Sequence, residues 1–222
     1  MVVNSSKSQE KGRALADELP EAIYVKADVS SEAQCKSLID EAVSKWGRLD
    51  ILVNNAGTTN VIPHQDLDAA TTEIWERIFR VNVLGPWYLI RVAAPHLRDS
   101  GDGCIINVSS LAGLRPAGSS IPYAVSKAAL NHLTRLLANV LAPTIRVNAI
   151  APGLIVTPWT EPYAEAHETF GKSVPLGRSG TAEEIAEVCL GVVRASYMTG
   201  EVVVADGGAQ LLAGTPIVRP RD

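Results

Sequence analysis

Short apolar runs alternate with helical patterns along the whole of this 222-residue chain. Three of the runs, Asp50–Asn54, Cys104–Val108 and Ile145–Ile150, are rich in apolar residues and show no strict polar alternation. Such runs are typical of parallel strands that are buried on both faces. Further strands are expected at Ala22–Asp28, at Glu201–Ala205 and at the apolar start formed by Val2, Val3 and Asn4.

Between these runs the apolar residues follow a helical period, and local signals mark helix ends. Ser31 and Gln34 have the spacing of a capping box, and the helix that they open should stop at Gly47. A long helical stretch over Thr71–Leu97 should bend near Gly85-Pro86. The other expected helices are Gln9–Leu19, Ser119–Leu141, Thr181–Arg194 and a less regular segment at Pro158–Lys172. Alternating strands and helices predict one α/β domain with a doubly wound parallel sheet of the Rossmann type.

Composition narrows the function without naming it. The net charge is -4 and the charges are scattered, which argues against a nucleic-acid or anionic-membrane surface. No uncharged apolar stretch reaches the roughly 18 residues of a membrane span, and we expect no signal peptide. The cysteines are far apart, which predicts reduced thiols in a cytoplasmic protein: Cys35, Cys104 and Cys189. The histidines are equally dispersed and predict no metal site.

Residues that can carry chemistry directly follow several of the expected strands. In a doubly wound sheet, ligands bind beyond the carboxyl ends of the strands. One strand is followed by Asn54–Gly57 (NNAG), the next by Ser109 and Ser110, and a third by Pro152-Gly153. We therefore expect these segments to meet at one edge of the sheet.

Tyr123 and Lys127 lie between two of these segments, inside a predicted helix. Their spacing of four residues places both side chains on one helical face. An ammonium near a phenol favours the phenolate, so Lys127 is expected to lower the pKa of Tyr123 from about 10. Such a phenol can transfer a proton near neutral pH, and a serine hydroxyl can hydrogen-bond the oxygen that receives it.

With these motifs in this order, the sequence resembles the short-chain dehydrogenase/reductase family, and within it the 3-oxoacyl-acyl-carrier-protein-reductase-like members. The resemblance extends from Val2 to about Gly208. The family places its serine 13 residues before its tyrosine, which selects Ser110 rather than Ser109. Its active-site asparagine matches Asn82 in FRVNVLG, and its turn after the last strand matches Asp206-Gly207-Gly208.

The resemblance implies hydride transfer between NADP(H) and a carbonyl or secondary alcohol substrate. Tyr123 would be the general acid in reduction and the general base in oxidation. Lys127 would lower the pKa of Tyr123 and hold the nicotinamide ribose, and Ser110 would position the substrate oxygen. Asn82 would kink its helix and hold a water molecule in a proton relay.

The resemblance also implies a set of cofactor contacts. Asp28 and Val29 match positions beside the adenine, and Asn55, Ala56 and Gly57 match the wall of the adenine ribose. The loop around the carboxamide matches Pro152, Gly153, Ile155 and Thr157.

The cofactor choice is expected to depend on the residues after the first strand. An NAD-preferring site usually has an acidic residue there. This chain instead has Asn4, Ser5, Ser6 and Lys7, whose hydroxyls and ammonium suit a 2′-phosphate, so NADP(H) is preferred and NAD(H) is the alternative.

The chain departs from the family at its start. A strand, a TGxxxGxG loop and a helix open the family's fold, and the loop holds the pyrophosphate. No such motif occurs in this sequence. We expect the natural protein to have this βα unit ahead of Met1, because the sheet needs its central strand and the cofactor needs the loop.

Other interpretations remain open. The missing loop would also suit a non-catalytic structural or regulatory relative, and Ser110 could in principle serve a hydrolase, although no GxSxG surrounds it. Asn54–Gly57 could be only a turn and Thr157 only a helix cap. A homo-oligomer, a tetramer or a dimer, is expected from apolar residues assigned to outer helix faces: Leu89, Val92, Leu133 and Leu137.

Overall fold

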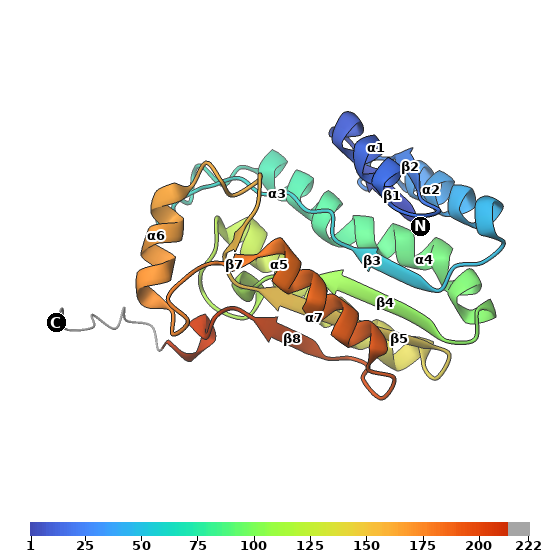
Figure 1. The fold of residues 1–222 in the computed structure, drawn as a ribbon. Coiled ribbons are helices and arrows are strands. Elements are labelled where there is room, and N and C mark those ends of the chain that lie inside the picture. The colour runs from blue at the N-terminus through green and yellow to red at the C-terminus, as the bar shows by residue number, and fades with distance from the viewer. Residues whose placement is uncertain (213–222) are drawn as a thin grey trace.

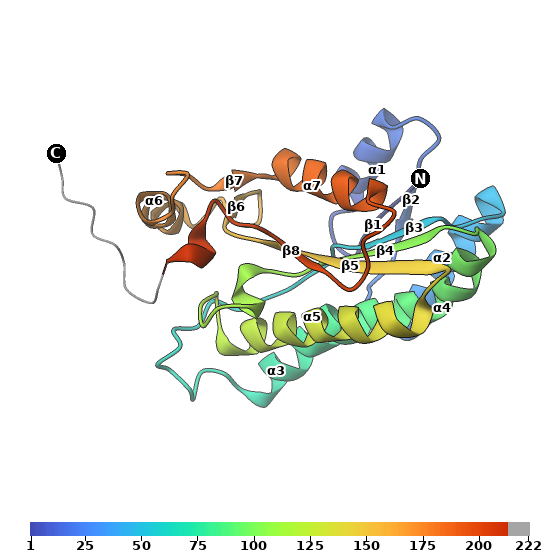
Figure 2. The same cartoon turned by 90° about the horizontal axis from the view of Figure 1, so that it is seen from below.

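The computed structural model describes residues 1–212, in which parallel strands lie between two layers of helices (Figures 1 and 2). The strands are β1 (Val2–Ser5), β2 (Ile23–Lys26), β3 (Ile51–Asn54), β4 (Gly103–Val108), β5 (Ile145–Pro152), β6 (Ile155–Val156), β7 (Gly180–Thr181) and β8 (Val202–Ala205). The α-helices are α1 (Gln9–Glu18), α2 (Glu32–Trp46), α3 (Thr72–Phe79), α4 (Gly85–Asp99), α5 (Ile121–Leu141), α6 (Ala164–Ser173) and α7 (Ala182–Arg194).

The main sheet has four parallel strands in the order β3-β4-β5-β8. Its central strands β4 and β5 are buried almost throughout, as their apolar sequences require. Helices cover both faces: α3, α4 and α5 lie on one side and α7 on the other (Figure 2). The predicted α/β fold with a doubly wound parallel sheet is therefore confirmed.

The sheet is interrupted between β1 and β3. β1 pairs only with β2, in a separate two-stranded parallel sheet, and the two sheets share no ladder within residues 1–212. One edge of β1 and one edge of β3 therefore lack strand partners among the described residues. The βα unit expected ahead of Met1 stays a prediction.

The two faces of β3 differ in how well they are covered. Leu52 is buried and joins a core shared by α2, α4 and α5. Ile51 and Val53 point to the opposite face, and each is 44% exposed. The core is thus continuous between the two sheets on the α2–α4 face, whereas the other face of β3 leaves apolar surface open.

The bend in the long helical stretch arises from a π-helical turn. Residues Arg80–Leu84 form this turn between α3 and α4, and Asn82 lies at its centre. The turn ends directly before Gly85-Pro86, where the bend was expected, and contains Asn82, where the resemblance implied a kink. Pro86 directly follows this turn, in the first turn of α4.

A short pair of strands escaped the sequence analysis. β6 and β7 form a two-residue parallel ladder that ties Ile155 to Gly180. A ladder of this length has no hydrophobic period, so the pattern alone does not reveal it. The ladder anchors both ends of the segment that contains α6.

The assignment of four apolar residues to outer helix faces is wrong. Leu89 and Leu137 are buried in the core, and Val92 and Leu133 pack against it. Both helices carry apolar residues around much of their circumference, so their sequences do not fix which stripe faces the sheet. The large apolar side chains that are exposed on them are Trp87, Val125, Leu136 and Val140.

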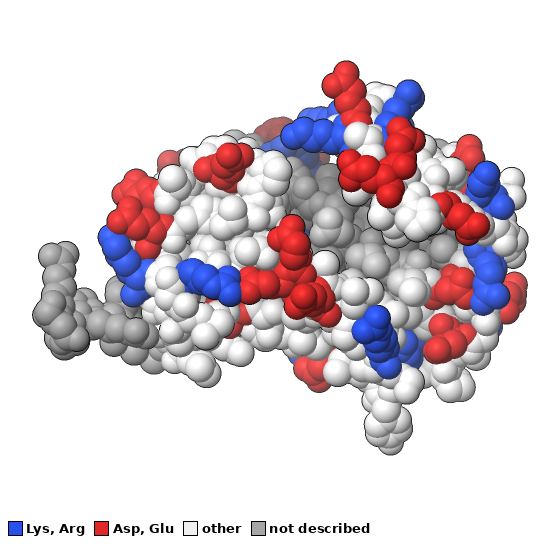
Figure 3. All heavy atoms as spheres, in the orientation of Figure 1, with Lys and Arg blue, Asp and Glu red and all other residues white. Residues whose placement is uncertain are grey.

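Charged side chains of both signs are mixed on the face shown in Figure 3. Several form exposed pairs, such as Arg178 with Glu184 at 2.5 Å. In the described part of the chain, no helix is both long and apolar enough to cross a membrane.

Candidate active site

Tyr123 and Lys127 project from the first turns of α5 toward the carboxyl ends of β4 and β5. Ser120 caps this helix by accepting a hydrogen bond from the Tyr123 N–H at 3.4 Å. The Lys127 side chain is buried, and its Nζ lies 5.7 Å from the centre of the Tyr123 ring. Lys127 Nζ donates to the Val108 carbonyl oxygen at 2.8 Å, which fixes it at the end of β4.

Burial shifts both titratable groups. It lowers the pKa of Lys127 to about 8, because the ammonium is removed from water. It also raises the pKa of Tyr123 above 10, and the neighbouring Ser110 hydroxyl only partly offsets this rise. Burial is thus the larger influence on the pKa of Tyr123, and its direction is opposite to the lowering expected from Lys127. That Lys127 lowers this pKa stays a prediction.

The two serines after β4 have different surroundings. Ser109 is buried and donates to the Lys127 carbonyl oxygen at 3.2 Å, so its hydroxyl is engaged within the core. Ser110 is partly exposed, and its Oγ accepts from the Ala112 N–H at 3.2 Å in the turn that precedes α5. This leaves the Ser110 hydrogen free to donate beside Tyr123, which agrees with the choice of Ser110 by spacing.

Asn82 joins the π-helical turn to the loop after β3 and to α5. Its amide nitrogen donates to the Thr58 carbonyl oxygen and to Ser126 Oγ, both at 3.0 Å, and its amide oxygen accepts from the Thr58 N–H at 2.9 Å. Asn82 is only 1% exposed, so all three bonds are shielded from water. This residue therefore fixes the relative position of two segments of the site.

Ser126 is a site residue that the sequence analysis missed. It is fully buried, receives the bond from Asn82 and donates to the Tyr123 carbonyl oxygen at 2.7 Å. Ser126 thus connects the π-helical turn to the helical turn that carries Tyr123. Its position three residues after Tyr123, on the same helical face, was the available signal.

The residues expected around the nicotinamide gather at the same edge of the sheet. Gly57 lies beside Asn82 and Lys127: a Cβ on Gly57 would be 3.7 Å from Lys127 Nζ. At Gly153, a Cβ would approach Asp206 Cα to 2.9 Å, so a side chain there would displace the turn after β8. The neighbouring residues Pro152 and Ile155 belong to β5 and β6.

Thr157 follows β6 and opens a tight turn rather than a helix. The Thr160 N–H donates to Thr157 Oγ1 at 3.3 Å, and the two threonine hydroxyls are 3.2 Å apart. Asn55 and Ala56 are exposed directly after β3, where the adenine ribose is expected.

The adenine side of the expected cofactor site lies at the ends of β1 and β2. Asn4 donates through its amide to the Val25 and Ala27 carbonyl oxygens at 3.0 and 3.1 Å, so both N–H groups hold β2. Ser5 Oγ is 2.9 Å from the Tyr24 hydroxyl. Of the four residues expected to contact the 2′-phosphate, only Ser6 and Lys7 are exposed and have no hydrogen-bond partner among the described residues.

Asp28 and Val29 follow β2. Asp28 Oδ1 accepts from the Ser30 N–H at 2.9 Å and shapes the turn into α2. Val29 is buried, and α4 packs on it closely at Gly85, where a Cβ would lie 3.1 Å from the Val29 carbonyl oxygen. Val29 therefore also has a packing role.

Known proteins resemble this chain over nearly its full length. The profile of the family described as enoyl-(acyl carrier protein) reductase matches residues 1–210. The "Granaticin polyketide synthase putative ketoacyl reductase 2" of Streptomyces violaceoruber is 55% identical over 215 residues, which cover 96% of this chain and 86% of the relative. The 3-oxoacyl-acyl-carrier-protein reductase FabG of Thermotoga maritima is 40% identical over 185 residues, which cover 82% of this chain and 74% of the relative.

A solved structure supports the same relationship. The structure of a gluconate 5-dehydrogenase from Burkholderia cenocepacia J2315 in complex with NADP and tartrate superposes with a TM-score of 0.86 at 30% identity. The match covers 96% of this chain and 86% of that one. The chain belongs to the short-chain dehydrogenase/reductase family, whose members are oxidoreductases that use a nicotinamide cofactor.

Proposed function

We propose that this chain is an NADP(H)-dependent reductase of acyl or polyketide ketones. The observation that carries the proposal is the joint arrangement of Ser110, Tyr123, Lys127 and Asn82 at the carboxyl ends of β3 and β4. The names of the Streptomyces and Thermotoga relatives, both ketoacyl reductases, support the ketone as substrate. The general class, a carbonyl reductase that also oxidises the alcohol in reverse, follows from the same site.

Lys127 has the capacity to hold the nicotinamide half of the cofactor. An ammonium has three N–H donors, and in the described residues only the Val108 carbonyl oxygen accepts one of them. The two remaining donors suit ribose hydroxyls, and the absence of a side chain at Gly57 leaves room beside Nζ. Asn55, Ala56, Pro152, Gly153, Ile155 and Thr157 complete the proposed contacts.

The residues of the site divide the chemistry between them. A bound NADPH supplies the hydride that reduces the carbonyl carbon. Tyr123 gives its phenolic proton to the carbonyl oxygen, and Ser110 donates a hydrogen bond to the same oxygen as negative charge develops. Lys127, when charged, stabilises the tyrosinate that remains, and Asn82 holds a water molecule of the relay that returns the proton.

NADP(H) is preferred over NAD(H) in this proposal. Ser6 and Lys7 are exposed after β1 and can hydrogen-bond and neutralise a 2′-phosphate. The gluconate 5-dehydrogenase structure contains NADP, which is consistent with this choice. Asp28 and Val29 would lie beside the adenine.

The experiment is a pair of fluorescence titrations with NADPH and NADH, followed by absorbance assays with a panel of ketones and 3-oxoacyl thioesters. We expect tighter binding of NADPH and oxidation of NADPH only when a ketone is present. The alternative function, a non-catalytic relative, is favoured by the interruption between β1 and β3 and would give no turnover with any ketone. Tighter binding of NADH would overturn the cofactor preference alone.

We also propose that the chain acts as a homo-oligomer in the cytoplasm. Trp87 on α4 and Leu136 and Val140 on α5 are 39%, 54% and 67% exposed. Both helices lie on the same side of the sheet (Figure 2). Apolar side chains of this size on one surface suit a subunit contact. Light scattering at micromolar concentration should give a multiple of 23.6 kDa, the mass of one chain.

A further inference from the structure

Ser126 lies between Tyr123 and Lys127 in α5, and it contacts the machinery of the site only from inside the protein. Its side chain is fully buried. Its hydroxyl oxygen is 3.0 Å from the Asn82 amide nitrogen and 2.7 Å from the Tyr123 carbonyl oxygen. Ser126 therefore touches the π-helical turn and the backbone of the proposed general acid at the same time.

The chemistry of the three groups fixes the direction of these two hydrogen bonds. A carbonyl oxygen only accepts, so the single hydroxyl hydrogen of Ser126 is committed to Tyr123. Ser126 Oγ can then only accept from Asn82, which requires that Asn82 turns its amide nitrogen, and not its amide oxygen, toward α5. The donors thus run in one direction, from Asn82 through Ser126 to the Tyr123 carbonyl oxygen.

Asn82 has no spare partner that could replace Ser126. The second hydrogen of its amide nitrogen is donated to the Thr58 carbonyl oxygen at 3.0 Å, and its amide oxygen accepts from the Thr58 N–H at 2.9 Å. Asn82 is only 1% exposed, and buried donors in proteins rarely lack an acceptor. Loss of the Ser126 hydroxyl would therefore make the π-helical turn shift or would draw water into it.

A shift of Asn82 would be felt at Lys127. A Cβ on Gly57 would lie 3.6 Å from the Asn82 amide oxygen and 3.7 Å from Lys127 Nζ, so both polar groups border the same space beside Gly57. The orientation of Asn82 thus bears on the proton relay proposed above, which passes this place.

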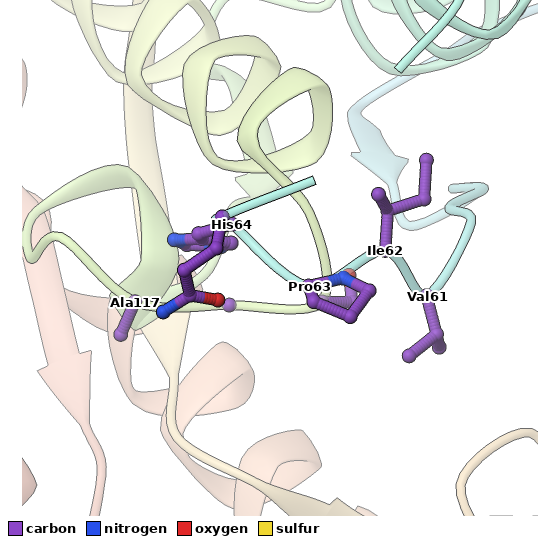
Figure 4. A pocket seen from close by; sticks show the side chains of 8 residues that line it. Val61, Ile62, Pro63, His64 and Ala117 are labelled. Carbon is purple, nitrogen blue, oxygen red and sulfur yellow. The ribbon is translucent and has the colours of Figure 1, made fainter. Parts of the chain in front are cut away.

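The loop after β3, which Asn82 holds through Thr58, has a second anchor that does not involve Ser126. The hydroxyls of Thr59 and Ser119 are 2.6 Å apart, and the Ile62 N–H donates to the Ser119 carbonyl oxygen at 2.8 Å. Ile62 and its neighbours line a hollow of about 390 Å³, shown in Figure 4. Loss of the Ser126 hydroxyl should leave this part of the loop in place.

We propose that Ser126 is a positioning residue for the return of the proton to Tyr123 during ketone reduction. After reduction, the tyrosinate takes a proton from the relay water, which takes one from solvent in turn. Ser126 holds Asn82 in the orientation that keeps this water in place, and it touches neither ketone nor cofactor. This inference rests on the proposed reductase function and adds to it a residue that acts on the rate and not on binding.

The test is the kinetics of Ser126→Ala with NADPH and a 3-oxoacyl thioester. We expect kcat to fall roughly tenfold, the loss for a buried donor without an acceptor, while KM for the thioester and Kd for NADPH stay unchanged. The solvent deuterium isotope effect on kcat should rise, because proton return becomes slower relative to hydride transfer. A merely structural role would change neither the isotope effect nor the balance between kcat and KM in this way.

Further variants separate the hydroxyl from the space that it fills. Ser126→Thr keeps the hydroxyl and should regain most of the lost kcat. Ser126→Cys keeps the side-chain size but accepts weakly, so it should show the same changes as Ser126→Ala to a smaller extent even if the alanine variant folds poorly. Ser100→Ala is the matched control: Ser100 directly follows α4, and its hydroxyl also donates at 2.7 Å to the carbonyl oxygen three residues earlier, that of Leu97. This control should leave kcat and the isotope effect unchanged.

A second measurement needs no turnover. In protein with ¹⁵N-labelled asparagine, the side-chain amide protons of Asn82 can be assigned by their loss in Asn82→Ala. One of the two should move upfield in Ser126→Ala and stay in place in Ser126→Thr. Unchanged amide protons in Ser126→Ala, or a fall in kcat without a rise in the isotope effect, would overturn the positioning role. A moved amide proton in a protein that reduces no ketone would instead contradict the proposed reductase function.

Discussion

The N-terminal unit, formed by β1, α1, β2 and α2, and the four-stranded sheet with its helices are built from similar βα segments. The two regions are stabilised very differently. In the sheet, β4 and β5 are buried along nearly their full length, and α7 begins with a complete capping box. In the N-terminal unit, β1 and β2 are only partly buried, and α1 buries just Gly12 and Ala16. The residues with proposed chemical roles stand on the better-packed region.

This difference follows from the interruption between β1 and β3. The N-terminal unit is joined to the rest through one face, where Cys35, Leu38 and Ile39 of α2 share a core with Leu89 and Ile90 of α4. On the other face α1 packs on β1 and β2, so closely that a Cβ on Gly12 would lie 2.3 Å from the Tyr24 ring. The region with the proposed catalytic residues is thus attached to a proposed nucleotide-binding end that has fewer internal contacts.

The largest expected effect is on the chemistry of the better-packed region. Tyr123→Phe removes the proton donor and keeps the ring, so turnover should fall by about 10²–10⁴-fold while the unfolding midpoint hardly changes. Steady-state kinetics and thermal unfolding of the same preparations check this. Retention of more than about a tenth of wild-type kcat would show that another group supplies the proton.

The second prediction uses the two faces of β3. Leu52→Ala should cost about 2–5 kcal/mol of unfolding free energy, since Leu52 is buried in the shared core. Val53→Ala, one residue further on the open face, should cost less than about 1 kcal/mol, because Val53 is already 44% exposed. Urea denaturation of the two variants measures both values. Equal losses would mean that the open face of β3 is covered in solution.

The four-stranded sheet and its helices were largely predictable from the sequence, because strong periodic signals and topology rules apply there. Apolar runs and caps located β3, β4, β5 and β8, and the rule that ligands bind at carboxyl ends placed Ser110 and Tyr123 together. The resemblance implied a kink at Asn82, but the hydrophobic pattern did not predict a π-helical turn there, since the residues around it continue the helical period without a break.

Other features depend on quantities that a sequence pattern does not contain. The apolar stripes of α4 and α5 were assigned to the wrong side, because only packing decides that Leu137 faces the core and Leu136 the solvent. The pKa of Tyr123 rises because desolvation outweighs the hydrogen bond with Ser110, and desolvation is known only once burial is known.

The third prediction concerns pH. Burial lowers the pKa of folded Lys127 to about 8 from 10.5, so the folded chain releases this proton first as pH rises. The unfolded chain binds more protons between these values, and stability from this group therefore increases with pH over that window. From pH 8 to pH 10, wild type should gain on the order of 2 kcal/mol of unfolding free energy relative to Lys127→Met.

Subtraction isolates Lys127 from groups that act in the opposite direction. Burial raises the pKa of Tyr123 and of Cys35. Wild type and Lys127→Met both contain these two groups, so their effect cancels in the difference. Lys45→Met, an exposed change in the last turn of α2, serves as the matched control and should show no such growth. A difference that stays flat for Lys127→Met would show that its ammonium remains solvated in solution.

The smallest expected effect compares the first residues of two helices, one in each region. Thr181 caps α7: its Oγ1 accepts from the Glu184 N–H at 3.3 Å, and Glu184 in return accepts from the Thr181 N–H at 2.9 Å. Ser8 occupies the same position before α1 but makes no capping bond. Thr181→Ala should therefore cost about 0.5–2 kcal/mol, whereas Ser8→Ala should stay within about 0.5 kcal/mol of wild type. Chemical denaturation resolves these values when the two variants are measured side by side. If Ser8→Ala were as costly as Thr181→Ala, the start of α1 would have a hydrogen-bonding partner in solution, and the contrast between the two regions would be smaller than their packing indicates.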